Sequence, residues 1–372
     1  MQVTVNFPQL QTLLFLIVFG LALIFSSKRY HPHFSLAKPL TNELKGFAIL
    51  GIIFSHIGYF LSKDPRFLFP LSIFAGLGVN LFLFLSGFGL ATSYLKNGHT
   101  IKLFYKKRLQ RIFIPLWIVL IFLLLFDWAT LHITYPWQTI LGNFLGWYPT
   151  ADIYQDLNSS LWYFSLILFY YLIFPLVFHR KIAYLSPIII TVISYLLFSY
   201  FLPSSAMVLK LYNLHFIAFP LGIVLALVNK NTNTITNQLS QLWNKTHLIP
   251  KTLRFFILAI LLLGFSYFSI NSNVGQGLAK EQLTSLFSMG LLLFIFVLKS
   301  LHFKLLSLFG TYSYEIYLIH WPLVYRYDLL YKYLPPFLAT LFYLVLFIIL
   351  GYLLQKAVQL ISQSSSNQAL EG

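Results

Sequence analysis

A lysine and a histidine in one long apolar run are the residues best placed to do chemistry. Lys45 and His56 are eleven residues apart in the run 45–62, which holds no other charged side chain. Eleven residues are close to three helical turns, so both side chains share a helix face, roughly 16 Å apart along the axis. A membrane hydrocarbon core is about 30 Å thick, which puts His56 near its middle. There an imidazole can act as a general base or a nucleophile, or it can simply hydrogen-bond a neighbouring carbonyl.

A second polar stripe lies toward the end of the chain. Ser313, Tyr317 and His320 are spaced i, i+4 and i+7, so they share one helix face. Glu315 lies about 140° from His320 on a helical wheel, and we expect it at the same depth as His56. Because a carboxylate inside a membrane needs a partner, we predict a contact in which Glu315 orients the His56 imidazole or stabilises its protonated form. The alternative is that Glu315 bonds tyrosines and only ties helices together.

Two further groups of residues suggest ligand binding. Arg108 and Arg111 share a helix face, and guanidinium groups match phosphate oxygens. Anchoring to anionic lipid would explain them equally well. Four of the seven tryptophans lie in or beside the acidic segment 127–160, where they can stack on a sugar ring or form an ordinary interface belt.

The composition excludes a soluble protein. Of the 372 residues, 58% are hydrophobic and only 9% are charged, whereas soluble proteins carry about 25% charged residues, and the mean hydropathy is +0.77. The absence of cysteine excludes disulfides, thiolate metal sites and a cysteine nucleophile, and we expect no metal and no nucleic-acid partner. The net charge of +16 instead predicts basic loops on the inner side of a membrane.

Eleven apolar runs predict an all-α fold, a polytopic bundle of about ten to eleven transmembrane helices. Strands are excluded as spans, because an open sheet leaves backbone groups unpaired in lipid and no alternating barrel pattern appears. With the N-terminus outside, the inner loops, among them 96–111, hold 19 of the 25 Lys and Arg residues. This asymmetry predicts an N-out, C-in topology. The runs are 9–26, 45–62, 70–95, 112–127, 160–178, 182–202, 212–229, 254–271, 282–298, 305–325 and 336–356.

The chain is predicted to have three parts. Residues 1–40 form a retained first helix and a basic inner loop, because the helix lacks the basic start and the cleavage site of a signal peptide. Residues 41–361 form the main membrane domain. Residues 362–372 form a short polar tail, expected to be disordered. The run that begins at Phe67 is too long for one straight span, and it is expected to begin with a re-entrant or interfacial piece.

Five short motifs follow one another in chain order: Lys45 with His56, Gly78–Phe88 (GVNLFLFLSGF), Tyr105–Pro115 with its two Arg residues, Leu161–Ser165 (LWYFS) with Tyr170, Tyr171 and Pro175, and Ser313–Pro322 (SYEIYLIHWP). Together they cover residues 41–325 and resemble the integral-membrane acyltransferase 3 family. Two positions depart from its pattern, since Lys45 stands where many members have Arg and Asn80 stands where Asp is common. The family usually has ten spans, so the first helix looks like an addition.

The resemblance implies an enzyme that moves an acyl group, most often acetyl, from cytoplasmic acyl-CoA to a hydroxyl of an extracytoplasmic polysaccharide or glycolipid. His56 would be the general base or be acylated transiently, with Glu315 in support. A multi-pass location in the bacterial plasma membrane is expected. Lys45, Arg108 and Arg111 would hold the CoA phosphates, Ser86, Tyr314 or Tyr317 would donate to the oxyanion, and Trp162, His320, Asp152 and Asp156 would bind the acceptor.

Two other functions fit parts of this pattern. A transporter or flippase for a lipid-linked sugar would use the same buried His, Glu and Arg as a pathway, and only the ordered motifs argue against it. Two broken half-helices at corresponding positions would favour transport, and the sequence indicates one, near 70–78. A degenerate acyltransferase kept as a scaffold is the third interpretation, disfavoured by the presence of His56 and both arginines.

Overall fold

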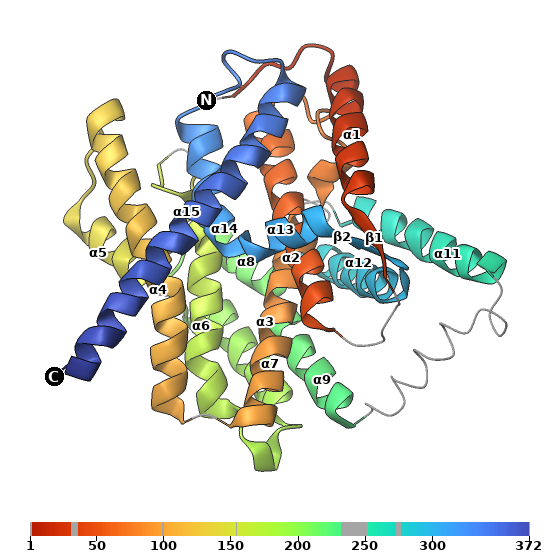
Figure 1. Cartoon of the computed structure of the whole chain (residues 1–372). Coiled ribbons are helices and arrows are strands. Elements are labelled where there is room, and N and C mark those ends of the chain that lie inside the picture. Colours follow the sequence, from red (N-terminus) through yellow and green to blue (C-terminus); the bar gives the residue numbers. More distant parts are fainter. Residues whose placement is uncertain are drawn as a thin grey trace.

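The computed structural model is a bundle of helices packed side by side (Figure 1). It describes residues 2–30, 36–98, 100–153, 155–231, 251–272 and 277–371. Within these residues, nine helical segments are long and apolar enough to cross a membrane, so the chain is a multi-pass membrane protein. They are formed by α1 (Pro8–Phe25), α2 (Lys38–Ser55), α3 (Ala75–Asn97), α4 (Ile101–Phe126), α6 (Trp162–Val177), α8 with α9 (Ala206–His215 and Ala218–Asn231), α11 (Lys251–Ile270), α12 (Leu278–Leu298) and α15 (Pro336–Glu371).

Two of the eleven predicted runs do not form long helices. The run 182–202 gives the shorter α7 (Ser186–Leu196) and a π-helical turn to Phe201. The run 305–325 is broken into α13 (Lys304–Thr311), α14 (Ser313–Trp321) and a π-helical turn to Arg326. In the run that begins at Phe67, a 3₁₀ turn at Leu71–Ile73 precedes α3. The re-entrant or interfacial start of this run stays a prediction.

Helix α13 packs very closely on α2. A Cβ atom added to Gly310 would lie 1.8 Å from the Asn42 carbonyl oxygen, and one added to Gly46 would lie 1.9 Å from the Leu306 oxygen. These two contacts run in opposite chain directions, so α13 lies antiparallel to the start of α2. After Thr311 the chain turns, and α14 returns along α2 to its far end.

Helical structure extends further at several ends than the hydropathy predicted. The expected inner loop 96–111 is mostly helix, because α4 begins at Ile101 and its N-terminus is capped by the Thr100 hydroxyl. Arg108 and Arg111 therefore lie on α4 itself. Likewise α15 continues to Glu371, where a disordered tail was expected, since no Pro or Gly interrupts this segment before the final residue. The sequence also predicted an inner loop at 229–254, and its residues 232–250 lie outside the described residues.

A short β-ribbon, not predicted from the sequence, joins distant parts of the chain. Strands β1 (Ser27–Arg29) and β2 (Leu301–Phe303) pair antiparallel, with Lys28 opposite His302. The buried Glu43 carboxylate supports the ribbon, because one oxygen accepts hydrogen bonds from Lys299 Nζ and from the Phe303 N–H, both at 2.6 Å. This ribbon fastens the end of α1 to the start of α13.

A buried ion pair fixes the segment that follows α4. Asp127 is fully buried, and Arg326 Nε donates to its carboxylate at 2.8 Å. The Tyr135 and Tyr327 hydroxyls also donate to that carboxylate, at 2.7 and 2.8 Å. Arg326 Nη1 donates to the Asp156 carbonyl at 3.0 Å. These contacts hold the segment 127–158, which contains α5 (Trp137–Leu145), against the π-helical turn that follows α14.

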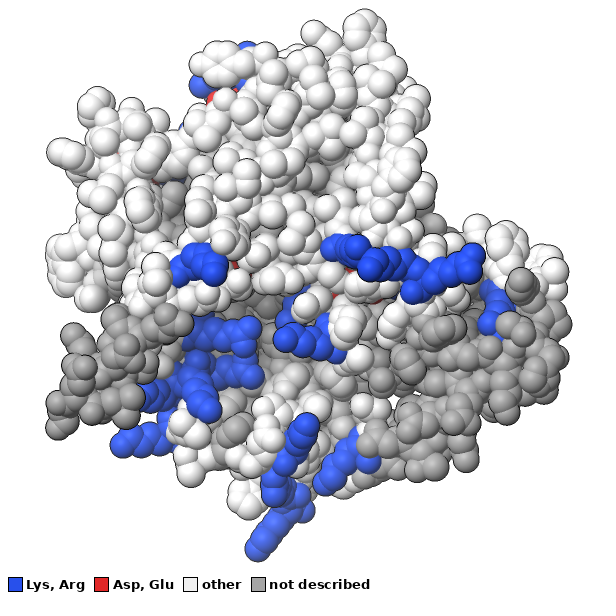
Figure 2. All heavy atoms as spheres, viewed as in Figure 1, with Lys and Arg blue, Asp and Glu red and all other residues white. Residues whose placement is uncertain are grey.

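The basic side chains are distributed unevenly over the surface. Figure 2 shows the Lys and Arg side chains around the middle and lower part of one face, while its upper part is almost free of them. Such asymmetry is what the positive-inside rule describes for a membrane protein. The N-out, C-in orientation itself stays a prediction.

Candidate active site

Two histidines from distant parts of the chain meet inside the bundle. His56 stands at the C-terminal end of α2, and its Nδ1 lies 2.9 Å from Nε2 of His320 on α14. The two rings are nearly parallel, 11° apart, with centroids separated by 5.0 Å. His320 is buried, while His56 is half-buried and so keeps some access to its surroundings. A half-buried imidazole held by one nitrogen has the second nitrogen available for proton transfer.

The partner of His56 differs from the prediction. The sequence predicted Glu315, whereas the hydrogen bond of His56 goes to His320. The physical reason is the helical register of α14, because residues five apart point about 140° from each other. With His320 facing α2, Glu315 points away from His56, and it feels the positive charge of Arg111 on α4. His320, predicted to bind the acceptor, instead has both ring nitrogens engaged within the protein.

Helix α14 is held in place by hydrogen bonds from its neighbours. Pro322 has no N–H, so it cannot donate to the Leu318 carbonyl four residues earlier. The buried Asn158 amide donates to that carbonyl instead, at 2.9 Å. The Tyr317 hydroxyl donates to the Ser160 carbonyl at 2.9 Å. These bonds fix the helix that carries His320 against the segment before α6.

Two of the predicted oxyanion donors are already engaged. Tyr314 donates its hydroxyl proton to the Ile112 carbonyl at 2.5 Å, and Tyr317 donates its own to Ser160. A tyrosine hydroxyl has a single proton, so neither can donate to a substrate in this arrangement. Both residues serve here to join α14 to neighbouring segments. Ser86, the third candidate, is half-buried on α3.

Aromatic rings enclose the histidine pair. The Trp321 ring meets His56 at 4.9 Å in an edge-to-face arrangement, and Phe60 meets it at 5.8 Å. Trp321 in turn stacks on Tyr325 at 4.8 Å. Apolar walls of this kind keep bulk water away from the imidazole and strengthen its polar contacts.

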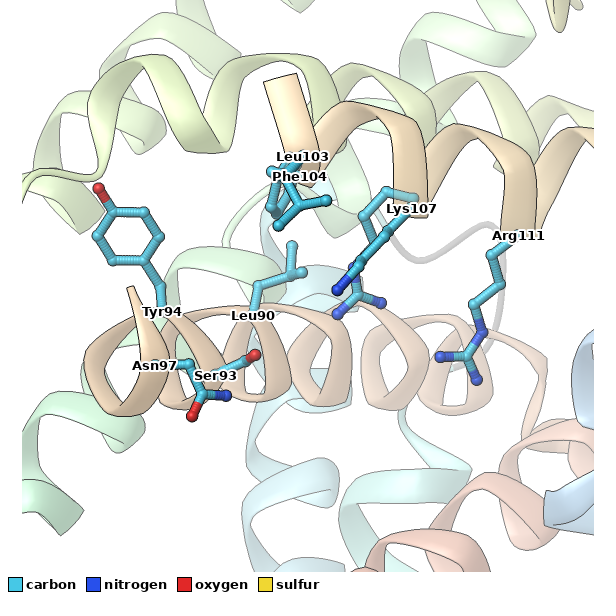
Figure 3. Close-up of a pocket in the computed structure, with 9 residues that line it drawn as sticks. Leu90, Ser93, Tyr94, Asn97, Leu103, Phe104, Lys107 and Arg111 are labelled. Atoms are coloured by element: carbon cyan, nitrogen blue, oxygen red, sulfur yellow. The ribbon is translucent and has the colours of Figure 1, made fainter. Parts of the chain in front are cut away.

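A basic cavity of about 360 Å³ lies between α3 and α4. Figure 3 shows Lys107 and Arg111 reaching from α4 toward α3, which presents Ser93 and Asn97. Hydropathy and charge indicated the two arginines, but they did not indicate the polar residues of α3, which look like an ordinary helix end. The lining residues are Leu90, Ser93, Tyr94, Asn97, Leu103, Phe104, Lys107, Arg108 and Arg111.

The predicted phosphate-binding residues converge from two helices. Lys45 on α2 feels the repulsion of both Arg108 and Arg111 on α4. Arg111 is also attracted to Glu315, five residues before His320 on α14. Five helical residues span about 7.5 Å. The cavity and the histidine pair are therefore linked through Arg111 and the short helix α14.

Of the predicted acceptor-binding residues, His320 belongs to the histidine pair, whereas Trp162, Asp152 and Asp156 have other contacts. Trp162 begins α6 and stacks on His215 at 6.0 Å. His215 is itself buried, with Nδ1 lying 2.8 Å from Asn80 Oδ1. Asn80 also donates to the Ser285 hydroxyl at 2.9 Å. This buried network joins four helices, and the spacing of its members in the sequence gave no sign of it.

The Asp152 and Asp156 carboxylates accept hydrogen bonds from groups in the loop that contains them. Asp156 accepts hydrogen bonds from the Thr150 hydroxyl and the Asp152 N–H, both at 2.8 Å. Burial raises the pKa of the Asp156 carboxyl, although these two hydrogen bonds oppose the rise. Asp152 Oδ1 accepts from the Gln155 N–H at 3.1 Å. The predicted sugar contacts of both residues stay a proposal.

Fold and site together define a multi-pass membrane protein that holds a histidine pair and a basic cavity within one helix bundle. Residues 42–356 match the family described as an acyltransferase domain, the acyltransferase 3 family. Because this match covers most of the chain, the chain belongs to that family, and membership indicates transferase activity. No curated protein and no solved structure gives a match to this chain.

Proposed function

We propose that the protein transfers an acyl group, in the first instance acetyl, from cytoplasmic acyl-CoA to a hydroxyl of an extracytoplasmic polysaccharide or lipid-linked sugar. The observation that carries the proposal is the pairing of His56 with His320 in a bundle that also holds a cationic cavity between α3 and α4. One part of the site can do proton chemistry and the other can bind a polyanion. A donor with phosphates at one end and a thioester at the other matches both parts.

The charge of the cavity favours a phosphate ligand. Arg108 and Arg111 line the cavity and repel each other, and Lys45 on α2, outside the lining, is near enough to feel the repulsion of both. Glu315 offsets only part of this positive charge. Cations held together in this way are stabilised by a bound anion, and guanidinium groups bind phosphate oxygens well. We place the CoA phosphates in this cavity, with the acyl end directed along α14 toward His56. Glu315 supports the site through its electrostatic attraction to Arg111.

At the histidine pair the reaction is a direct acyl transfer. His56 Nε2 takes the proton from the acceptor hydroxyl while that oxygen attacks the thioester carbonyl carbon. The C–S bond then breaks, and the CoA thiolate receives the proton from His56 Nε2. The products are an ester and free CoA thiol. His56 Nε2 has no hydrogen-bond partner among the described residues, which supports its role as the base.

Acyl transfer in membranes tests the proposal. Membranes containing the wild-type protein, His56→Ala or His179→Ala receive radiolabelled acetyl-CoA, and label is counted in the polysaccharide and glycolipid fractions. We expect label with the wild type and with His179→Ala, because the His179 side chain is exposed just after α6 and does not line the cavity. His56→Ala should lower the rate by roughly 10²-fold or more, the usual contribution of a general base.

Equal incorporation by His56→Ala would keep the enzyme but remove His56 from the chemistry. A wild-type protein that neither incorporates label nor binds CoA would overturn the proposal. A covalent acyl-histidine trapped on His56 would replace the direct transfer with a two-step reaction through the same residue.

A further inference from the structure

The hydrogen bonds around His320 determine where its proton lies. His320 Nδ1 lies 2.9 Å from the Tyr317 carbonyl oxygen and 3.1 Å from the Ile316 carbonyl oxygen. A carbonyl oxygen can only accept, so His320 Nδ1 carries a hydrogen. In the neutral ring the other nitrogen, Nε2, is then an acceptor with a lone pair.

The same reasoning passes to His56. Its Nδ1 lies 2.9 Å from His320 Nε2, and one of these two atoms must donate. Since Nε2 of neutral His320 can only accept, Nδ1 of His56 carries the hydrogen. The second nitrogen of His56, Nε2, is then left with its lone pair, which is the form that a general base requires.

We infer that His320 is a positioning residue that holds His56 in the tautomer protonated on Nδ1, so that Nε2 faces the reactants as the base. This inference rests on the proposed acyl transfer for its purpose. His320 touches His56 and the backbone of α14, and it has no ring nitrogen left for a substrate. Its role is therefore distinct from acceptor binding.

The hydrogen on His320 Nδ1 is held in place by backbone carbonyls, not by side chains. Tyr317 and Ile316 lie within α14, and both are buried. The helix is fixed by the Asn158 amide on the Leu318 carbonyl and by the Tyr317 hydroxyl on the Ser160 carbonyl. The proton on His320 Nδ1 thus depends on main-chain atoms that rotation of a side chain cannot move.

The arrangement also accounts for the charge formed during transfer. When His56 Nε2 takes the hydroxyl proton, His56 becomes an imidazolium whose Nδ1–H points at the lone pair of His320 Nε2. That hydrogen bond becomes charge-assisted and therefore stronger. His320 needs no net negative charge for this purpose, unlike the carboxylate that usually supports a catalytic histidine. When the thiolate takes the proton back, both rings return to their first state.

The tautomer can be measured directly on the full-length protein. We would label the wild type with ¹⁵N-histidine, reconstitute it in bilayers and identify the His56 signals by their loss in His56→Ala. The expected result is His56 protonated on Nδ1, and a change to the Nε2-protonated form in His320→Leu. His179→Gln is the matched control and should leave the His56 signals unchanged. His56 protonated on Nε2 in the wild type would overturn the inference, whatever the variants do.

Activity gives a second and independent readout. His320→Gln keeps an acceptor oxygen that can reach the His56 Nδ1–H, whereas His320→Leu removes it. We expect kcat to fall by roughly 10²-fold in His320→Leu and to recover substantially in His320→Gln, with little change in KM for acetyl-CoA. Equal kcat in wild type and His320→Leu would overturn the inference, and so would a loss confined to KM.

The two proposals fail in different ways. If the wild type transfers label but His56 is protonated on Nε2, the positioning role fails and the acyltransferase stands. If no transfer occurs while His56 is protonated on Nδ1, the histidine geometry stands and the proposed reaction fails.

Discussion

At the scale of residues, some basic side chains of α4 line the α3–α4 cavity, whereas their neighbours in the sequence lie only on the surface. Lys106 and Lys107 are both exposed on α4, but only Lys107 lines the cavity. Arg108 is half-buried there and lies over the Tyr171 ring, with 5.9 Å between the guanidinium carbon and the ring centre. Neighbouring residues in one basic run therefore have different expected roles.

Replacement of Arg108 should weaken donor binding specifically. Arg108→Ala removes a charge-assisted contact to phosphate worth about 1.5–3 kcal/mol, so KM for acetyl-CoA should rise by about tenfold or more. Lys106→Ala changes the charge of the chain equally and should leave KM unchanged. Steady-state kinetics in membranes measure both variants. An equal rise in KM in the two variants would mean that only the general basicity of this region matters.

At the scale of elements, the close contact between α2 and α13 sets where α14 begins. Glycine at 46 and 310 lets the two backbones touch, and α14 then turns back along α2 until His320 reaches His56. The site therefore depends on two positions that carry no side chain. Neither glycine belongs to the ionisable residues that a search for chemistry would select.

Gly310→Ala should disturb both stability and activity. The added methyl carbon would lie 1.8 Å from the Asn42 oxygen, so α13 must move away from α2. Overpacking of this kind costs about 1–3 kcal/mol, and we expect a lower Tm together with slower acyl transfer. Gly290→Ala on α12 meets no atom within 4 Å and should be neutral or slightly stabilising. A normal Tm and normal transfer rate in Gly310→Ala would contradict this account of α13.

Hydropathy largely predicted the long transmembrane helices, but it did not predict where a run is broken into shorter helices. Long apolar runs predict helices because, in lipid, the backbone N–H and C=O groups of a single segment can hydrogen-bond only within that segment. Nine of the eleven runs form such helices. The break at Tyr312 and the β-ribbon depend on contacts between residues far apart in the chain. Pairing of His56 with His320 also needed the relative rotation of α2 and α14. The sequence placed both residues on defined faces but could not orient the helices toward each other.

At the scale of the whole molecule, cysteine labelling measures the predicted orientation in the membrane. The chain has no cysteine, so a single introduced cysteine gives an unambiguous label. Lys102→Cys lies near the start of α4, on the predicted inner side. Tyr333→Cys lies between α14 and α15, on the predicted outer side, at a position that is 80% exposed.

A membrane-impermeant maleimide distinguishes the two orientations. In intact cells we expect Tyr333→Cys to react, and Lys102→Cys to react only after permeabilisation, because the basic ends of the helices stay in the cytoplasm. The wild type should not react. Labelling of Lys102→Cys alone in intact cells would reverse the topology, and it would also move the proposed donor cavity to the outer side.

The ribbon of β1 and β2 has a consequence for how the protein is made. Arg29 pairs with Leu301, so the first strand leaves the ribosome about 270 residues before its partner. At a synthesis rate of about 5–20 residues per second, it waits roughly 14 to 54 seconds with its hydrogen-bonding edge unpaired. Closure of the ribbon is therefore a late event in assembly. A chain that stops before residue 301 lacks β2, so the backbone groups of Ser27–Arg29 that β2 would pair stay open to pairing with another chain.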